Sequence, residues 1–167
     1  MSNVIKNASS VVSTTQIGVI GKIYEELFTD SAGNLTMRYL RVFKAGATVT
    51  AGQMVGCNDL AGESEMYETG TCIPTPDGTM PRGRIYGMSI SAVASGSYGF
   101  CVCRGVVDGL SSHTSVTEGM FLATYATTDG MVMDAGAVSS SGESIQILGH
   151  ALGTMGSGVV KAYINVL

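Results

Sequence analysis

The sequence predicts an all-β protein with a single domain, and three observations lead to this prediction. Its 167 residues include 23 glycines but only three prolines, with many Ser, Thr and Val residues, as in short strands joined by tight turns. From Val42 onward, short apolar segments follow one another at fairly regular spacing, which is typical of a sandwich or a barrel. The chain length suits one compact domain and leaves no room for a second.

The composition also argues against several classes of partner. Only 13% of the residues are charged and the net charge is −4, with basic residues scattered along the chain, so we expect no direct contact with nucleic acid. No run of about 18 apolar residues and no signal-peptide pattern occurs, so we expect no membrane partner. The weakly charged surface indicates that neighbouring subunits bury part of it.

Residues 1–16 are polar and rich in β-prone residues, without a helical or strand period. We expect them to form an extended N-terminal arm, with residues 17–167 as the β domain. A purely solvated tail does not need apolar residues, so the arm's four are candidate contacts with a neighbouring subunit, through strand addition to its sheet. They are Val4, Ile5, Val11 and Val12. We also expect that removing the arm leaves the stability of the core nearly unchanged.

Residues 17–27 allow two interpretations. Their apolar residues are spaced as on a helix, but Gly18 and Gly21 weaken that interpretation. The alternative, which we favour, is a hairpin with strands Ile23–Thr29 and Leu35–Phe43. The segment between them, residues 30–34, consists of turn formers.

Three segments are assigned to the central core: Tyr86–Ala92, Tyr98–Val107 and Val160–Val166. The first and last alternate larger apolar residues with small or polar ones, which predicts half-buried strands. All three prolines fall in Pro74–Pro81, which predicts a loop. Residues 58–83 are therefore expected to be the largest irregular excursion.

A weak internal repeat relates residues 48–55 to residues 115–122, since each contains a hydroxyl residue followed by Val, Thr, any residue and Gly. This pattern also arises by chance in β proteins, so the sequence leaves open whether it reflects a duplication.

Four cysteines could form two disulfides or a metal site: Cys57, Cys72, Cys101 and Cys103. A single residue separates Cys101 from Cys103, which is too close for the usual zinc spacing. We therefore predict buried, unpaired thiols and no metal or other cofactor.

A search for catalytic groups finds one cluster, in which Asp108, Ser111, Ser112 and His113 lie within six residues. Catalytic triads are assembled from separate segments, and a solvated turn has the same composition. His150 is expected to be a sheet residue and not a ligand. We therefore predict that the protein is not an enzyme. The absence of Trp disfavours glycan binding, but leaves contacts through Tyr67, Tyr98 or Tyr125 open.

The segment Lys44–Gln53, with the pattern K-A-G-A-x-x-x-A-G-Q, resembles the head decoration (cement) proteins of tailed bacteriophages. Further stretches similar to the same family are Gly105–Gly109, Val116–Leu122 and Asp129–Gly136. The resemblance implies a small β-barrel or β-tulip domain, commonly a homotrimer. It also implies that the domain binds the major capsid protein on the outer surface of the virion and stabilises the head.

Two other functions remain as alternatives. One is a head-fibre or tail-associated protein that binds host glycans, and the other is a hydrolase that uses Asp108 and His113. If the decoration function is right, the protein is made in the reducing bacterial cytoplasm, which favours free thiols.

Overall fold

The computed structural model describes residues 4, 5, 7–57, 66, 68–74, 85–113, 115–124, 128–137 and 147–167. Within these residues the fold is all-β, as predicted, with eleven strands in one continuous sheet and two short 3-10 helices, Ala8–Ser10 and Ala135–Ala137. The strands are β1 (Val4–Ile5), β2 (Tyr24–Thr29), β3 (Leu35–Ala45), β4 (Met54–Gly56), β5 (Thr71–Pro74), β6 (Ile85–Ser89), β7 (Tyr98–Ser111), β8 (Phe121–Thr124), β9 (Val132–Asp134), β10 (Gly149–Ala151) and β11 (Val159–Asn165).

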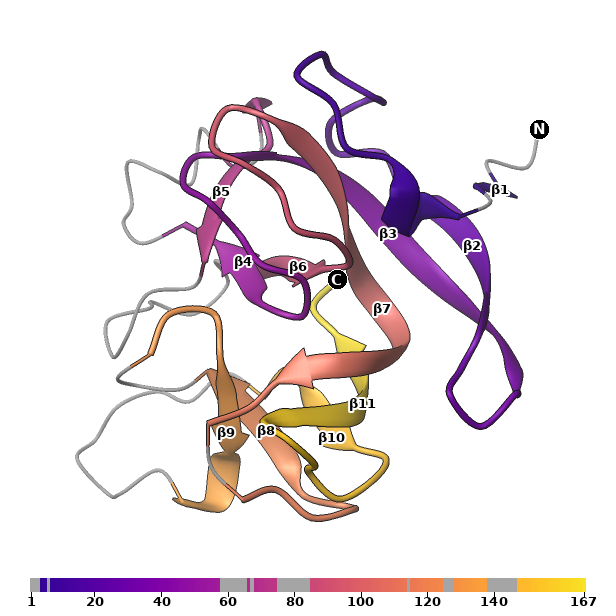
Figure 1. The fold of residues 1–167 in the computed structure, drawn as a ribbon, viewed down its shortest axis with the longest axis vertical. Helices are drawn as coiled ribbons and strands as arrows, with labels where there is room; N and C mark the ends of the chain where they lie inside the picture. Colours follow the sequence, from indigo (N-terminus) through magenta and orange to yellow (C-terminus); the bar gives the residue numbers. More distant parts are fainter. Residues whose placement is uncertain are drawn as a thin grey trace.

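The sheet closes twice and so forms two small barrels. Barrel 1 has the strand order β3-β5-β4-β6-β7 and closes because β7 also pairs with β3. Barrel 2 has the order β7-β11-β10-β8-β9 and closes through a parallel bridge between Ser112, just after β7, and Val132 of β9. Figure 1 shows barrel 1 above barrel 2, with the long strand β7 running from one to the other.

The two barrels have the same topology and the same register. If β3, β4, β5, β6 and β7 of barrel 1 are matched to β7, β8, β9, β10 and β11 of barrel 2, every neighbour and every strand direction agrees. Residue pairs agree as well: Met54↔Met88 matches Phe121↔His150, Val55↔Gly87 matches Leu122↔Gly149, and Val55↔Pro74 matches Leu122↔Asp134. The chain therefore contains an internal structural duplication.

The weak sequence repeat lies at equivalent places in this duplication. Its glycines, Gly52 and Gly119, have φ values of 86° and 87°, a left-handed conformation that favours glycine. Gly52 N donates to Ser89 O (2.8 Å), and Gly119 N donates to Ala151 O (3.0 Å), at matching positions of β6 and β10. The repeat is therefore structural, and each copy forms the turn that leads into β4 or β8.

Two apolar clusters fill the molecule. One occupies the interior of barrel 1 and contains Phe43, Ala45, Val49, Val55, Cys57, Met66, Cys72, Tyr86, Val93 and Cys101. The larger one fills barrel 2 with residues such as Leu110, Val116, Leu122, Leu148, Ala162 and Ile164, and continues onto the outer face of barrel 1. There Val42, Met54, Met88, Phe100 and Val102 are buried under Ala8, Tyr24 and their neighbours.

The hairpin predicted for residues 23–43 is confirmed, and the helix is wrong for these residues. β2 and β3 pair antiparallel from Tyr24↔Leu40 to Thr29↔Leu35. In the turn, Asp30 N donates to Asn34 O (3.0 Å), and Gly33, with φ of 84°, donates to Asp30 O (2.9 Å).

The strand prediction for Val160–Val166 is confirmed, since Val160, Ala162 and Ile164 of β11 are buried. The prediction for Tyr86–Ala92 is partly wrong, because β6 ends at Ser89 and is buried on both faces. A bulge, with Gly87 opposite Val55 but Ile85 opposite Gly56, turns Tyr86 into barrel 1 while Ile85 joins the outer cluster. The simple alternation of the sequence does not reveal such a bulge.

The predicted irregular excursion at 58–83 is wrong in its middle. Thr71–Pro74 form β5, a strand of barrel 1 between β3 and β4. Pro74 is accommodated at the last position of this strand, where it lies opposite Val55. Residues 58–65, 67 and 75–84 lie outside the described residues.

Candidate functional site

The described part of the N-terminal segment lies along barrel 1. Val4 and Ile5 pair in parallel with β2, and Ser13 exchanges backbone hydrogen bonds with Tyr98 of β7. Ala8 is fully buried, and Ile5 and Val11 pack against the same cluster. The expectation that this segment contributes little to the core is therefore wrong, because it covers the outer face of barrel 1.

The four predicted contact residues divide into two pairs. Ile5 and Val11 point into the domain and pack against its core. The side chains of Val4 and Val12 are exposed, at 47% and 42%, and remain accessible to a partner. Contact of these residues with a neighbouring subunit stays a prediction.

A buried ion pair fastens the N-terminal segment to the hairpin. Glu26 Oε2 accepts a hydrogen bond from Arg38 Nε at 2.5 Å, and Glu26 Oε1 accepts one from the backbone N of Ala8 at 2.9 Å. The Arg38 guanidinium also lies 4.0 Å from the centre of the Phe28 ring. Sequence reasoning missed this pair, since Glu26 and Arg38 meet only when β2 and β3 are in register.

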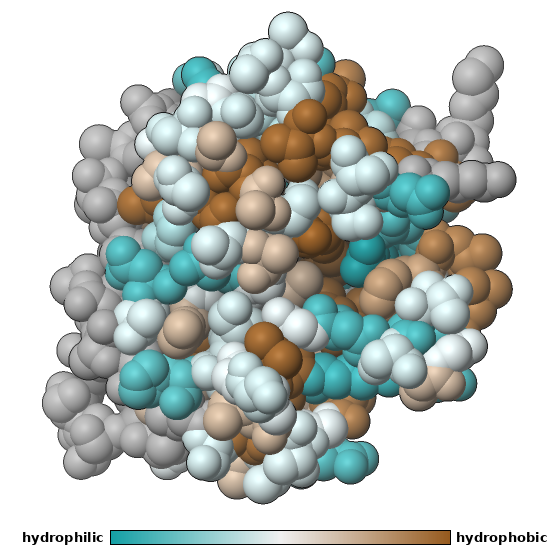
Figure 2. All heavy atoms as spheres, viewed as in Figure 1, coloured by the Kyte–Doolittle hydropathy of each residue, from teal (hydrophilic) through white to brown (hydrophobic). Residues whose placement is uncertain are grey.

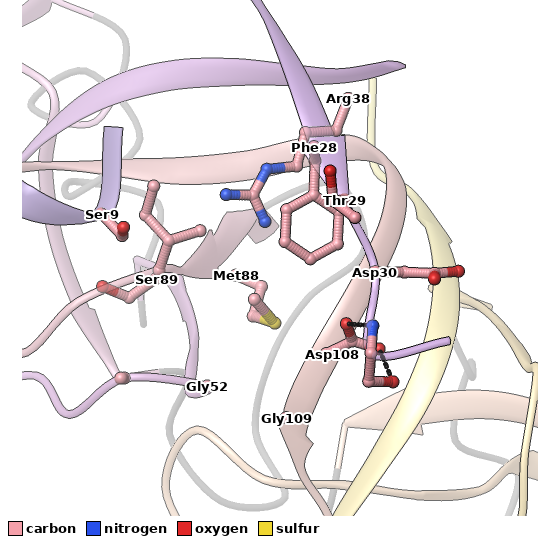
Figure 3. A pocket seen from close by; sticks show the side chains of 13 residues that line it. Ser9, Phe28, Thr29, Asp30, Arg38, Gly52, Met88, Ser89, Asp108 and Gly109 are labelled. Atoms are coloured by element: carbon pink, nitrogen blue, oxygen red, sulfur yellow. Dashed lines mark hydrogen bonds between the residues drawn. The ribbon is translucent and has the colours of Figure 1, made fainter. Parts of the chain in front are cut away.

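A cleft of about 420 Å³ lies between the hairpin and the junction of the two barrels. Figure 3 shows the Phe28 ring and the Arg38 guanidinium on one side, Met88 and Ser89 on another, and Asp108 towards the hairpin turn. Its charged groups are already engaged within the fold, which favours a structural crevice.

Two carboxylates hold the tip of the hairpin against barrel 2. Asp108 of β7 accepts hydrogen bonds from the backbone N of Ser31 at 2.7 Å and from its hydroxyl at 3.1 Å. Asp30 forms an ion pair with Lys161 of β11 at 2.6 Å. The hydrogen bond from Lys161, aided by those from Asn34, lowers the pKa of Asp30 to about 2 from the ordinary 3.8, although desolvation opposes the shift.

The candidate catalytic cluster is divided between structural contacts. The Asp108 carboxylate is bound to Ser31, and the buried Ser112 hydroxyl donates to Val132 O at 3.3 Å. His113 is exposed, and its backbone N donates to Val132 O. His150 lies in β10, as expected of a sheet residue, and its ring stacks on Tyr163 at 5.7 Å.

All four cysteine side chains are buried. Cys101 and Cys103 lie on β7, and their thiols contact the carbonyl oxygens of Arg41 and Tyr39. Desolvation raises the pKa values of Cys72, Cys101 and Cys103, so their reactive thiolate forms are disfavoured. In the part of the chain that the structure describes, no group of three His, Cys, Asp or Glu residues could hold a metal ion.

Of the three tyrosines named for glycan contacts, Tyr98 is half-buried at the start of β7, while Tyr67 and Tyr125 lie outside the described residues. The described residues contain no helix that is long and apolar enough to span a membrane.

Exposed apolar side chains gather on one face of the sheet. Leu27 and Met37 lie directly opposite each other on β2 and β3, with exposures of 53% and 41%, and Leu35 at 63% shares their face. In barrel 2, Phe121 is 62% exposed and lies opposite His150, which in turn pairs with Tyr163. Figure 2 shows brown residues over the hairpin at the right-hand edge of the view. We call this surface, which spans β8, β10, β11, β7, β3 and β2, the open face.

Comparisons with known proteins identify no family. No family model matches the chain, and no curated protein matches it. Among solved structures, it is similar to the N base of the head fiber gp8.5 of bacteriophage phi29, with a TM-score of 0.44 and 13% sequence identity, over 76% of this chain and 93% of that chain.

Proposed function

We propose that this chain is a structural protein of a tailed-bacteriophage virion, which binds the outer surface of the capsid and stabilises the head. The proposal rests on the positions of two stretches that resemble decoration proteins. Residues 44–53 and 129–136 are far apart in sequence, but they meet at the junction of the barrels. Met54 N, directly after the first stretch, donates to Gly130 O in the second at 2.8 Å.

The residues of these stretches build the junction. Gln53 Oε1 accepts a hydrogen bond from Thr50 N at 2.8 Å, and its Nε2 donates to Asp129 O at 3.1 Å. A Cβ on Gly130 would lie 2.8 Å from the Gln53 side chain, so only glycine fits there without a shift. The resemblance therefore rests on residues that determine the architecture, as expected for a protein whose function is repeated surface contact. The proposal includes no catalysis and no cofactor.

For capsid contact we propose the outward side of the N-terminal segment, at Val4 and Val12. Both side chains are exposed, and the segment is joined to the β domain by hydrogen bonds of Ala8 to Glu26 and of Ser13 to Tyr98. A pre-ordered apolar contact costs less conformational entropy on binding than a free arm would. The partner is the major capsid protein.

Co-sedimentation of the purified protein with phage heads stripped of accessory proteins tests the proposal. We expect the wild type to sediment with the heads and Val12→Asp to bind at least about tenfold more weakly, because the contact would have to bury a charge. Val159→Asp is the matched control, since Val159 is similarly exposed (40%) but lies on β11.

No binding of the wild type to heads would contradict the capsid function. Binding to host cells or their glycans instead would support the head-fibre or tail alternative. Equal head binding by the wild type and Val12→Asp would show that capsid contact lies elsewhere on the molecule.

A further inference from the structure

The open face contains a row of four residues in register across four strands. Glu25 of β2 lies opposite Tyr39 of β3, Tyr39 opposite Arg104 of β7, and Arg104 opposite Asn165 of β11. Tyr163, two residues before Asn165, connects this row to His150 and Phe121 of barrel 2. The apolar residues of the hairpin and of barrel 2 therefore belong to one surface.

The duplication shows that the equivalent surface of barrel 1 is covered. Phe121, His150 and Tyr163 of barrel 2 correspond to Met54, Met88 and Val102 of barrel 1. The three barrel 1 residues are at most 3% exposed, under the N-terminal segment and hairpin, whereas Phe121 is 62% exposed. Within the described residues, the chain supplies no comparable cover for barrel 2.

Two opposite charges flank Tyr39 in the row. Arg104 is exposed and is held in place by a hydrogen bond from its Nε to the Tyr163 hydroxyl at 3.2 Å and by the Tyr39 ring, 5.8 Å from its guanidinium carbon. Neither Arg104 nor Glu25 has a salt-bridge partner among the described residues. One copy of this row can therefore offer an anchored cation to the carboxylate of another.

We propose that the open face is a self-association surface, on which a second copy of this chain packs with its Arg104 against Glu25 of the first. The charge pattern is self-complementary, so each copy supplies both the cation and the anion. The exposed apolar residues on either side of the row supply the area that such an interface buries. The pairing is reciprocal in a two-fold dimer and head-to-tail in the expected homotrimer.

Charge reversal tests the pairing, with the molecular mass measured by light scattering over a range of micromolar concentrations. We expect the wild type to exceed the 17.2 kDa of one chain. Glu25→Arg and Arg104→Glu should each weaken self-association at least about tenfold, because like charges then face each other. The double variant restores opposite charges and should regain association. Glu68→Arg, an exposed change next to β5, is the matched control.

Met37→Asp provides a second test that does not depend on the ion pair, and it should also dissociate the oligomer because it places a charge in the apolar part of the face. Melting curves confirm that each variant is folded. A monomeric wild type would overturn the proposal. So would single reversals that associate like the wild type, or a folded double variant that stays dissociated. Head binding is not measured, so the proposed function can fail independently.

Discussion

The two barrels share a topology but differ in what covers them. In barrel 1 the outer face carries Met54, Met88 and Phe100, and the N-terminal segment and hairpin bury these residues. In barrel 2 the matching positions carry Phe121, His150 and Lys161, and these remain accessible to different degrees. The duplicated unit is thus the barrel alone. The cover, which consists of the N-terminal segment and the hairpin, has no counterpart among the described residues of barrel 2.

This difference shows how one framework serves two environments. In barrel 1, apolar residues face outward from the barrel, and the N-terminal segment and the hairpin bury them. In barrel 2, Lys161 lies at the position equivalent to Phe100 and binds Asp30 at the tip of the hairpin. Phe121 is an exception, because it is apolar and exposed at an outward-facing position of barrel 2. Its exposure therefore indicates contact with a partner.

The largest expected effect comes from deleting residues 1–12. This removes Ala8, Ile5 and Val11 from the outer face of barrel 1 and leaves Glu26 without its backbone donor. We expect the free energy of unfolding in urea to fall by about 5 kcal/mol or more. Val12→Ser, a change at an exposed side chain, is the control. If the truncated protein had the same free energy of unfolding as the wild type, the segment would be a separate arm and not part of the core.

Glu26→Ala should have a slightly smaller effect, localised in the cover of barrel 1. It leaves the buried Arg38 guanidinium without its carboxylate, which typically costs about 3–5 kcal/mol. Urea unfolding measures the loss, and Glu118→Ala, in an exposed turn before β8, should change stability by less than about 0.5 kcal/mol. Equal effects of the two substitutions would show that the buried pair does not fasten the cover.

Substitution of two equivalent glycines by Ala tests whether the two barrels, which share a register, also contribute similarly to stability. A Cβ at Gly87 would lie 2.6 Å from Val102 O, and one at Gly149 would overlap Tyr163 O at the matching position. Each substitution by Ala should therefore cost about 1–3 kcal/mol in a thermal or urea melt. Gly156→Ala, with nothing within 4 Å, is the control. A cost at only one of the two glycines would contradict the equivalence.

The smallest effect concerns the link between the hairpin and barrel 2. The pKa of Asp30 is lowered to about 2 from 3.8, so its ionised form stabilises the fold. This contribution is complete above pH 3.8 and is lost as the pH falls through about 2. Asp30→Asn should lack this part of the acid dependence of the melting temperature, and Lys161→Met should move it towards pH 3.8. Identical pH profiles for all three proteins would contradict the role of the pair.

The sequence predicted those parts of the fold that depend on local patterns. The hairpin turn at Asp30–Asn34 and the alternation along Val160–Val166 are properties of neighbouring residues, and both were recognised. The repeat at 48–55 and 115–122 was visible, but its meaning required the pairings of β6 and β10. The strand β5 was missed because it is short and ends in a proline that usually marks a loop.

The surfaces were harder to predict than the strands. Ala8 looks like part of a polar tail, but it is buried, and its backbone N donates to Glu26, 18 residues away. The row from Glu25 through Tyr39 to Arg104 forms only when three separate strands align. Asp108 and His113 were grouped because they are close in sequence, but Asp108 serves the hairpin turn. Proximity along the chain therefore predicted neither surface nor site.

Strand β7 belongs to both barrels, and this affects how the molecule responds to mechanical force. It is the last strand of barrel 1 and the first of barrel 2, and it pairs with β3 and β6 in one and with β11 in the other. Residues 98–104 of this strand pair in barrel 1 and residues 104–111 pair with β11 in barrel 2, so Arg104 is paired in both barrels. A pull on one barrel is carried into the other through continuous backbone hydrogen bonds and not through a flexible linker. We therefore expect the two barrels to bear tension together.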